Sequence, residues 1–134
     1  MGNLGQKIKV LIADDHPLDR LGLKVTFSAT NDIKVADEVE NGDDLLRKVL
    51  ENTNNPYHLV LLDITMPGMS GGDVLKQLRE ENPKLPILVF SGHSQEQCAV
   101  RSIKAGASEY LTKKSPTEQL VEVVRKVARN SSRV

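Results

Sequence analysis

Five short runs of Val, Ile and Leu alternate with longer segments whose apolar residues have helical spacing. The runs are predicted strands, and they cover residues 8–13, 33–36, 59–62, 86–90 and 110–111. Several of them are apolar at successive positions, which is typical of parallel strands buried on both faces. The alternation predicts a (βα)₅ chain, in which right-handed crossovers join the strands of one doubly wound parallel sheet and helices cover both its faces.

The segments between the runs are predicted helices, because their apolar residues recur every three or four positions. The predicted stripes are Leu18, Leu21 and Val25; Leu45, Leu46, Val49 and Leu50; Val74, Leu75 and Leu78; and Leu120, Val123, Val124 and Val127. The fourth helix, about residues 95–105, has the thinnest stripe, chiefly Cys98, Ala99 and Ile103. We therefore expect it to pack least tightly and to move most easily. Gly106 follows it, where a left-handed cap is expected.

Length and composition exclude several classes of protein. The 134 residues are enough for one domain, and 18 basic against 18 acidic residues give no net charge, which argues against a basic nucleic-acid binder. The single cysteine excludes an intrachain disulfide, and the apolar runs are far shorter than the ~20 residues that span a bilayer. No signal-peptide pattern is present. We expect a soluble, cytoplasmic domain over residues 7–129, with a disordered tail at 1–6 and a tail or linker at 130–134.

Polar residues follow four of the predicted strands. Asp14 and Asp15 follow the first strand, Asp63 the third and Ser91 the fourth, and the fifth runs into Lys113. In an open parallel sheet the ligand site lies beyond the carboxyl ends of the strands, where the strand order reverses. With the order 2-1-3-4-5, the three carboxylates meet at that point, and the hydroxyl and the ammonium lie beside them.

Three carboxylates in one crevice repel one another, so the site needs a cation or protonation. Mg²⁺ suits it, because this ion takes oxygen ligands, uses one or two carboxylates and recruits phosphate oxygens. Zinc is not expected, since no His or Cys cluster accompanies the acids. We expect His16, His58 and His93 to be surface or loop residues, with His16 and His93 near the mouth of the crevice. The combination of metal, ammonium and hydroxyl around Asp63 suits phosphoryl transfer onto its carboxylate.

Four sequence motifs resemble the receiver domains of two-component response regulators. They are Val10-Leu-Ile-Ala-Asp-Asp-His-Pro17, Leu61-Leu-Asp-Ile-Thr-Met-Pro-Gly-Met-Ser-Gly71, Val89-Phe-Ser-Gly92 and Ala105-Gly-Ala-Ser-Glu-Tyr-Leu-Thr-Lys113. The resemblance covers almost the whole chain, from about Lys7 to Ala128. It implies a flavodoxin-like and CheY-like fold.

The resemblance also implies a role for each matching position. Asp63 would accept a phosphoryl group from a sensor histidine kinase. The Mg²⁺ ligands would be Asp15, Asp63 and the main-chain carbonyl of Thr65, with Asp14 acting mostly through water. Lys113 would pair with the phosphoryl group. Ser91 and Tyr110 would form a switch pair that changes the face of the fourth helix, fifth strand and fifth helix. Thr65 and His93 occupy the positions that tune how long the phosphoryl group persists.

The ending Lys113-Lys114-Ser115 differs from many receivers, in which proline follows the lysine directly. Its combination with Ala13-Asp-Asp-His-Pro17, in the form Tyr110-Leu-Thr-Lys-Lys-Ser-Pro116, is similar to regulators of the NarL/FixJ class, which usually carry a C-terminal helix-turn-helix of LuxR type. The chain is then a receiver fragment of a DNA-binding transcription regulator, which we favour, or a stand-alone receiver or phosphorelay intermediate. Homodimerisation on phosphorylation stays open. A small aspartyl-phosphate phosphatase is disfavoured, since Thr65 stands where such enzymes have a second aspartate; no enzymatic activity beyond self-phosphorylation and dephosphorylation is expected.

Overall fold

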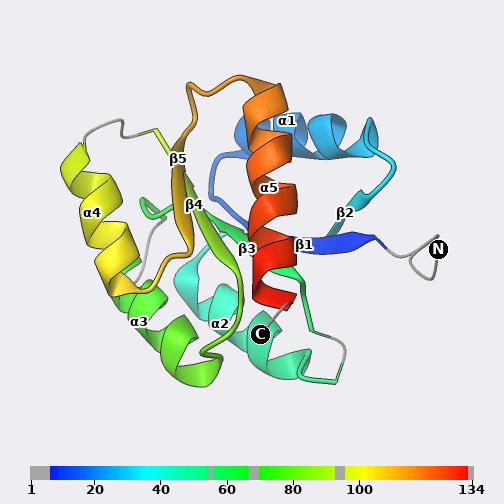
Figure 1. The fold of residues 1–134 in the computed structure, drawn as a ribbon. Helices are drawn as coiled ribbons and strands as arrows, with labels where there is room; N and C mark the ends of the chain where they lie inside the picture. The colour runs from blue at the N-terminus through cyan, green and yellow to red at the C-terminus, as the bar shows by residue number, and fades with distance from the viewer. Residues whose placement is uncertain (1–6, 55, 67–69, 93–95, 133–134) are drawn as a thin grey trace.

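The computed structural model describes residues 7–54, 56–66, 70–92 and 96–132. Five strands alternate with five helices along this part of the chain (Figure 1). The elements are β1 (Ile8–Ala13), α1 (Pro17–Ser28), β2 (Ile33–Val39), α2 (Gly42–Glu51), β3 (Leu59–Leu62), α3 (Gly71–Glu81), β4 (Ile87–Ser91), α4 (Glu96–Ala105), β5 (Glu109–Thr112) and α5 (Thr117–Ser132).

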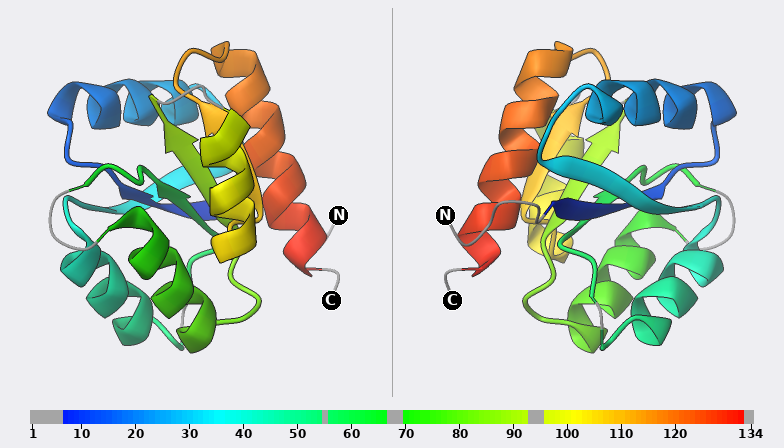
Figure 2. Two further views of the ribbon diagram at one scale, coloured as in Figure 1. Left: turned by 90° about the vertical axis from the view of Figure 1, so that its left-hand side faces the viewer. Right: turned by 90° about the vertical axis from the view of Figure 1, so that its right-hand side faces the viewer.

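The strands form one parallel sheet in the order β2-β1-β3-β4-β5, which confirms the predicted topology. Helices α1 and α5 cover one face, and α2, α3 and α4 cover the other (Figure 2). Successive strand residues point to opposite faces, so Val10 and Ile12 pack in the core under α1 and α5, whereas Leu11 and Ala13 pack in the core under α2 and α3. Burial on both faces explains why these strands are continuous apolar runs.

The edge strand β2 extends to Val39, three residues beyond its predicted end. Its continuation contains Asp37 and Glu38, and the pairing with β1 shifts by one residue between Val10 and Leu11. An edge strand has one open side, so it tolerates charged side chains that a central strand would not. The sequence-based prediction therefore ended this strand too early, because Asp37 and Glu38 interrupt its apolar run.

Helix α1 buries a different face from the predicted one. Leu18, Leu21 and Val25 are 80%, 53% and 62% exposed, whereas Leu23 and Phe27 pack against the sheet. Both sets have helical spacing, so periodicity alone could not decide between them. The predicted stripe of α1 was thus wrong, and that of α2 holds in part: Leu45 and Val49 are buried, but Leu50 is exposed.

Helix α4 has the thin packing that its sequence predicts. Ser102 is its one fully buried residue, and Val100 and Ile103 are nearly half exposed. Its C-terminal end is well fixed, because Gly106 has a φ of 124° and its carbonyl accepts two hydrogen bonds from the Arg79 guanidinium. The left-handed cap at Gly106 is confirmed. No helix in the described ranges is long and apolar enough to cross a membrane.

Candidate functional site

The carboxyl edge of the sheet brings the predicted site residues together. Just past the strand ends, the main-chain N–H of Asp63 donates to the carbonyl of Ala13 over 2.9 Å, and that of Lys113 donates to the carbonyl of Ser91 over 2.7 Å. These bonds extend the parallel ladder by one residue. The side chains of Asp14, Asp63 and Lys113 therefore start from backbone positions that the sheet itself fixes.

Lys113 is the charged centre of the site. Its Nζ lies 2.8 Å from Asp14 Oδ2, 2.9 Å from Asp63 Oδ2 and 2.7 Å from Asp19 Oδ2. An ammonium group has three protons, and here each has a carboxylate acceptor. Burial by itself would lower the pKa of Lys113, but these three hydrogen bonds outweigh it and raise the pKa above its ordinary value. Lys113 therefore stays charged at neutral pH.

Asp63 is a buried carboxylate with three donors. Its side chain is 2% exposed, its Oδ1 accepts from the main-chain N–H and the hydroxyl of Thr65 at 2.9 and 2.7 Å, and its Oδ2 accepts from Lys113. Burial would raise the pKa of Asp63, but the hydrogen bonds from Thr65 and Lys113 together lower it. Asp63 is therefore ionised at neutral pH, as a nucleophile must be.

Asp15 supplies a carboxylate oxygen that lacks a donor. Its Oδ1 is buried and makes no hydrogen bond within the described part of the chain. A buried oxygen in this state is costly unless a cation or water meets it. One ligand atom from each of Asp14, Asp15, His16 and Asp63 lies within 4.8 Å of the others. These oxygen-rich donors fit the needs of Mg²⁺.

The ring of His16 lies inside this cluster. Its Nδ1 is 3.0 Å from Asp14 Oδ1 and 3.4 Å from Asp63 Oδ2. The hydrogen bond with Asp14 is the main cause that raises the pKa of His16. We expected a surface residue near the crevice mouth, and the side chain is indeed 54% exposed, but its Nδ1 faces the acids.

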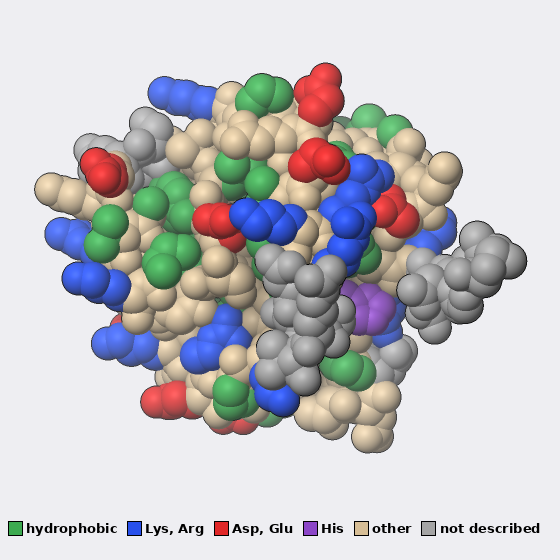
Figure 3. Space-filling model, in the orientation of Figure 1, with side chains coloured by type: hydrophobic (Ala, Val, Ile, Leu, Met, Phe, Trp, Pro, Cys, Tyr) green, Lys and Arg blue, Asp and Glu red, His purple; other side chains and the backbone are tan. Residues whose placement is uncertain are grey.

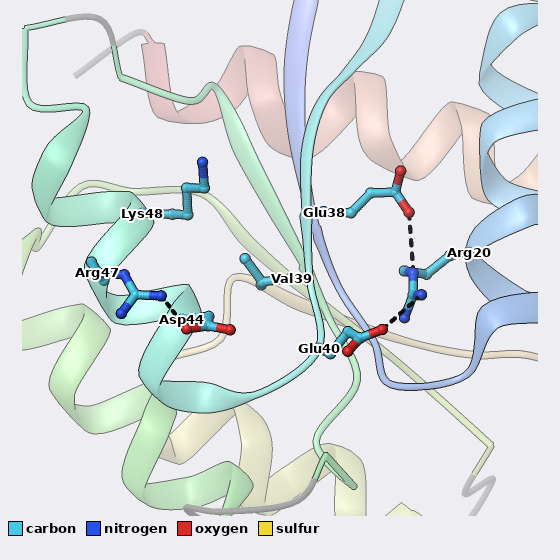
Figure 4. Close-up of a pocket in the computed structure, with 7 residues that line it drawn as sticks. All are labelled: Arg20, Glu38, Val39, Glu40, Asp44, Arg47 and Lys48. Carbon is cyan, nitrogen blue, oxygen red and sulfur yellow. Dashed lines mark hydrogen bonds and ion pairs between the residues drawn. The ribbon is translucent and has the colours of Figure 1, made fainter.

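Arg20 ties the acidic loop to β2. Its Nη1 donates to the main-chain carbonyl of Asp14 over 2.6 Å, while Nε and Nη2 pair with Glu38 and Glu40 at 3.1 and 3.0 Å. Figure 4 shows the guanidinium between the two glutamates. Only 14% of the Arg20 side chain is exposed. It thus fixes the backbone that carries Asp14 and Asp15.

Ser91 and Tyr110 lie on neighbouring strands. Ser91 is fully buried at the end of β4, and Val89 pairs with Tyr110 of β5 in the sheet. Burial raises the pKa of Tyr110, and a hydrogen bond with Ser91 partly offsets that effect. The two predicted switch residues are therefore in direct contact.

Sequence reasoning missed Asp19 and Arg20 and underrated His16. Asp19 lies in the first turn of α1, where an acidic residue is expected for the helix itself, so its sequence position did not mark it as a site residue. No sequence signal links Arg20 to the Asp14 carbonyl. The predicted lifetime position His93 lies outside the described residues, and the main-chain carbonyl of Thr65 remains a predicted Mg²⁺ ligand.

Charged side chains of both signs lie on the face of the molecule that Figure 3 shows. Figure 3 shows basic and acidic side chains on the same face, with hydrophobic side chains in small separate groups between them.

Comparison with known proteins gives consistent results. The family model described as "Response regulator receiver domain" matches residues 10–125. The nitrate/nitrite response regulator protein NarL of Escherichia coli strain K12 is 38% identical over 119 residues, which cover 89% of this chain and 54% of that protein. The uncharacterized transcriptional regulatory protein YhcZ of Bacillus subtilis strain 168 is 36% identical over 115 residues, covering 86% of this chain and 52% of that protein.

The solved structures include a two-component response regulator of the LuxR family from Aurantimonas. It has a TM-score of 0.86 at 26% identity, and the match covers 93% of this chain and 87% of that one. The chain spans about half the length of the curated relatives it matches.

Proposed function

The chain belongs to the response regulator receiver domain family, its relatives are bacterial regulators of the NarL type, and we propose that it accepts a phosphoryl group on Asp63. The observation that carries this proposal is the contact of Asp63 with both Lys113 and Thr65 in a buried, ionised state. A carboxylate held charged beside an ammonium group has the protonation state and the counter-charge that phosphoryl transfer needs.

The transfer step balances with a phosphohistidine of a sensor kinase as donor. An oxygen of the Asp63 carboxylate forms a bond to phosphorus, while the bond from phosphorus to the imidazole nitrogen breaks and its electron pair returns to the ring. The product is an acyl phosphate. Lys113 would offset the charge of the phosphoryl oxygens, and Ser91 would donate a hydrogen bond to one of them.

We propose that Asp15, Asp63 and the main-chain carbonyl of Thr65 hold Mg²⁺, with Asp14 acting mostly through water. A bound Mg²⁺ would supply positive charge opposite the carboxylates and the phosphoryl oxygens. The Oδ1 atom of Asp15, which is buried without a hydrogen bond and lies 3.3 Å from His16 Nδ1, supports this assignment. Catalysis would be confined to the domain's own phosphorylation and dephosphorylation. Thr65 and His93 would tune the lifetime of the phosphoryl group on Asp63.

The contact between Ser91 and Tyr110 supports a switch that reaches the surface. If the hydroxyl of Ser91 turns toward a phosphoryl group on Asp63, its hydrogen bond with Tyr110 is lost, and the ring can move inward. The thin packing of α4 would then let the face of α4, β5 and α5 rearrange. A homodimer that forms on phosphorylation would use this change.

We also propose where the domain acts and what kind of protein it belongs to. A receiver over residues 7–129 would act in the cytoplasm, with the flanking residues as tails or a linker. Since these curated relatives are about twice as long and one of them, YhcZ, carries the name of a transcriptional regulatory protein, the parent protein would be a DNA-binding regulator whose separate helix-turn-helix domain contacts DNA. A stand-alone receiver is the alternative.

Labelling with a small phosphodonor tests the central proposal. Incubation with acetyl phosphate and Mg²⁺ is expected to add one phosphoryl group, measured by intact mass, and Asp63→Asn is expected to prevent it. Asp43→Asn, on the exposed start of α2, serves as the matched control and should be labelled like the parent. Equal labelling of Asp63→Asn would overturn the assignment.

A further inference from the structure

A cavity of about 210 Å³ lies between helices α3 and α4, which are neighbours on one face of the sheet (Figure 1). Ile64, Leu75 and Ala105 give it apolar walls, and the thiol-bearing Cys98 also lines it. An apolar cavity of about 150 Å³ takes up benzene in an unrelated protein. The space between α3 and α4 is therefore large enough for one six-membered ring with a small substituent.

A buried hydroxyl group faces this cavity. Ser102 of α4 is 4% exposed and lines the cavity, and its hydroxyl makes no hydrogen bond with any residue that the structure describes. A hydroxyl removed from water without a partner costs free energy, so it marks a place where a polar atom of a ligand belongs. The Ser102 hydroxyl can donate one hydrogen bond to such an atom.

Two features make the rim of the cavity positive. The guanidinium of Arg101 lines it and forms no ion pair or hydrogen bond within the described ranges. Gly71 and Gly72 line it from the other side, at the start of the eleven-residue α3, where a helix has free main-chain N–H groups and the positive end of its dipole. Asp73 in the same turn offsets part of this dipole but does not line the cavity. The rim therefore favours an anionic group.

The two glycines differ in what packing requires of them. A Cβ atom on Gly71 would lie 2.5 Å from the Cβ of Ile64, so packing within the chain explains this glycine. A Cβ atom on Gly72 would meet nothing within 4 Å, and the φ of Gly72 is not positive. Glycine at this second position leaves the start of α3 open to a ligand in the cavity.

We propose that the cavity between α3 and α4 binds a small aromatic carboxylate, such as benzoate. The ring would lie between Ile64 and Leu75, and the carboxylate would accept hydrogen bonds from Arg101 and Ser102. The ligand would bury apolar surface of α4, the most thinly packed helix described, and so stabilise its position against α3. No part of this site depends on phosphorylation of Asp63, so the inference goes beyond the proposed function.

NMR titration of the ¹⁵N-labelled, unphosphorylated chain with sodium benzoate at constant ionic strength tests the proposal. We expect saturable shifts of the Gly72 and Ser102 amide signals, with a dissociation constant in the low millimolar range, as befits so small a ligand. Arg101→Gln should weaken binding at least about fivefold, and Ser102→Ala about fivefold. Lys104→Gln is the matched control, since this exposed cation of α4 does not line the cavity, and it should bind like the parent. Neutral benzamide should bind more weakly than benzoate.

Alkylation of Cys98, the one cysteine of the chain, gives a second readout. Benzoate should slow the reaction of this thiol with iodoacetamide, followed by intact mass, and should slow it less in Arg101→Gln. Thermal unfolding checks that each variant folds, and Arg101→Gln, which changes an exposed side chain, keeps the test decisive if Ser102→Ala is unstable.

Three results would overturn the proposal. The first is the absence of saturable shifts in the parent, and the second is equal affinity of the parent and Arg101→Gln for benzoate. The third is an equal loss of affinity in Lys104→Gln, which would mean that benzoate is attracted to basic surface in general. Acetyl phosphate labelling of Asp63 is measured separately, so failure of the proposed function leaves this test unchanged.

Discussion

The ammonium of Lys113 lies 2.9 Å from the Oδ2 atom of Asp63, across 50 residues of sequence. Both groups are largely buried, with 17% and 2% of their side chains exposed. The same ammonium also binds Asp14, so two buried carboxylates share its one positive charge. Loss of this cation leaves them with the His16 ring and the Thr65 donors but without an adjacent ammonium group.

We expect Lys113→Met to destabilise the metal-free domain by about 2–4 kcal/mol, because removing one partner of a buried ion pair leaves uncompensated charge. Mg²⁺ should restore part of the loss, since a dication can replace the missing charge. Urea unfolding with and without Mg²⁺ measures both effects. Lys114→Met, at the exposed neighbouring position, should unfold like the parent; a similar loss there would contradict the explanation.

Arg20 allows a test of how the acidic loop is positioned. Arg20→Met removes the hydrogen bond to the Asp14 carbonyl, and we expect Mg²⁺ affinity to fall about tenfold or more, as for other partners that orient metal ligands. Lys24→Met is the matched control, since Lys24 pairs with the same Glu38 at 2.9 Å. Calorimetric titration measures the affinities, and thermal unfolding checks that both variants fold. Equal losses of Mg²⁺ affinity in the two variants would mean that the effect comes from the lost ion pair with Glu38 and not from the Asp14 carbonyl.

The ion pair between Asp32 and Arg125 predicts a dependence of stability on pH. Arg125 donates to both carboxylate oxygens at 2.8 and 3.0 Å, and this hydrogen bonding is the main cause that lowers the pKa of Asp32. A carboxyl whose pKa is lowered by folding stabilises the fold above its unfolded value of about 3.9, and the contribution disappears as pH falls through the folded pKa.

Arg125→Gln should therefore cost about 1 kcal/mol or less at pH 7, since both side chains are partly exposed. The difference in free energy of unfolding between this variant and the parent should vanish in strong acid. Urea unfolding at a series of pH values from 7 to about 2 measures it. A difference that stays constant over this range would show that the pair acts through packing and not through charge. Lys76→Gln, an exposed change on α3, gives the baseline.

The strand ends explain why so much of the site could be predicted. In a parallel sheet the residue after each strand lies at the same edge, so Asp14, Asp63 and Ser91 could be placed together from strand positions alone. Asp19 could not, because its contact with Lys113 depends on the path of the β1–α1 loop and on side-chain reach across 94 residues of sequence. Contacts made by long side chains leave no periodic trace in a sequence.

The buried face of helix α1 also could not be predicted from the sequence. Its sequence carries two apolar sets, and only the position of the sheet decides which set is buried. Leu18→Gln, which keeps a good helix former, is expected to change the free energy of unfolding by no more than about 0.5 kcal/mol, because Leu18 is 80% exposed.

Phe27→Ala, on the other face of α1, should cost about 3–5 kcal/mol, since its ring is 1% exposed within the core under α1 and α5. Urea unfolding of the two variants beside the parent decides between the faces. A large loss for Leu18→Gln with a small loss for Phe27→Ala would mean that α1 packs as the sequence pattern predicted. The opposite result would support the observed orientation of α1, in which Leu18, Leu21 and Val25 face solvent.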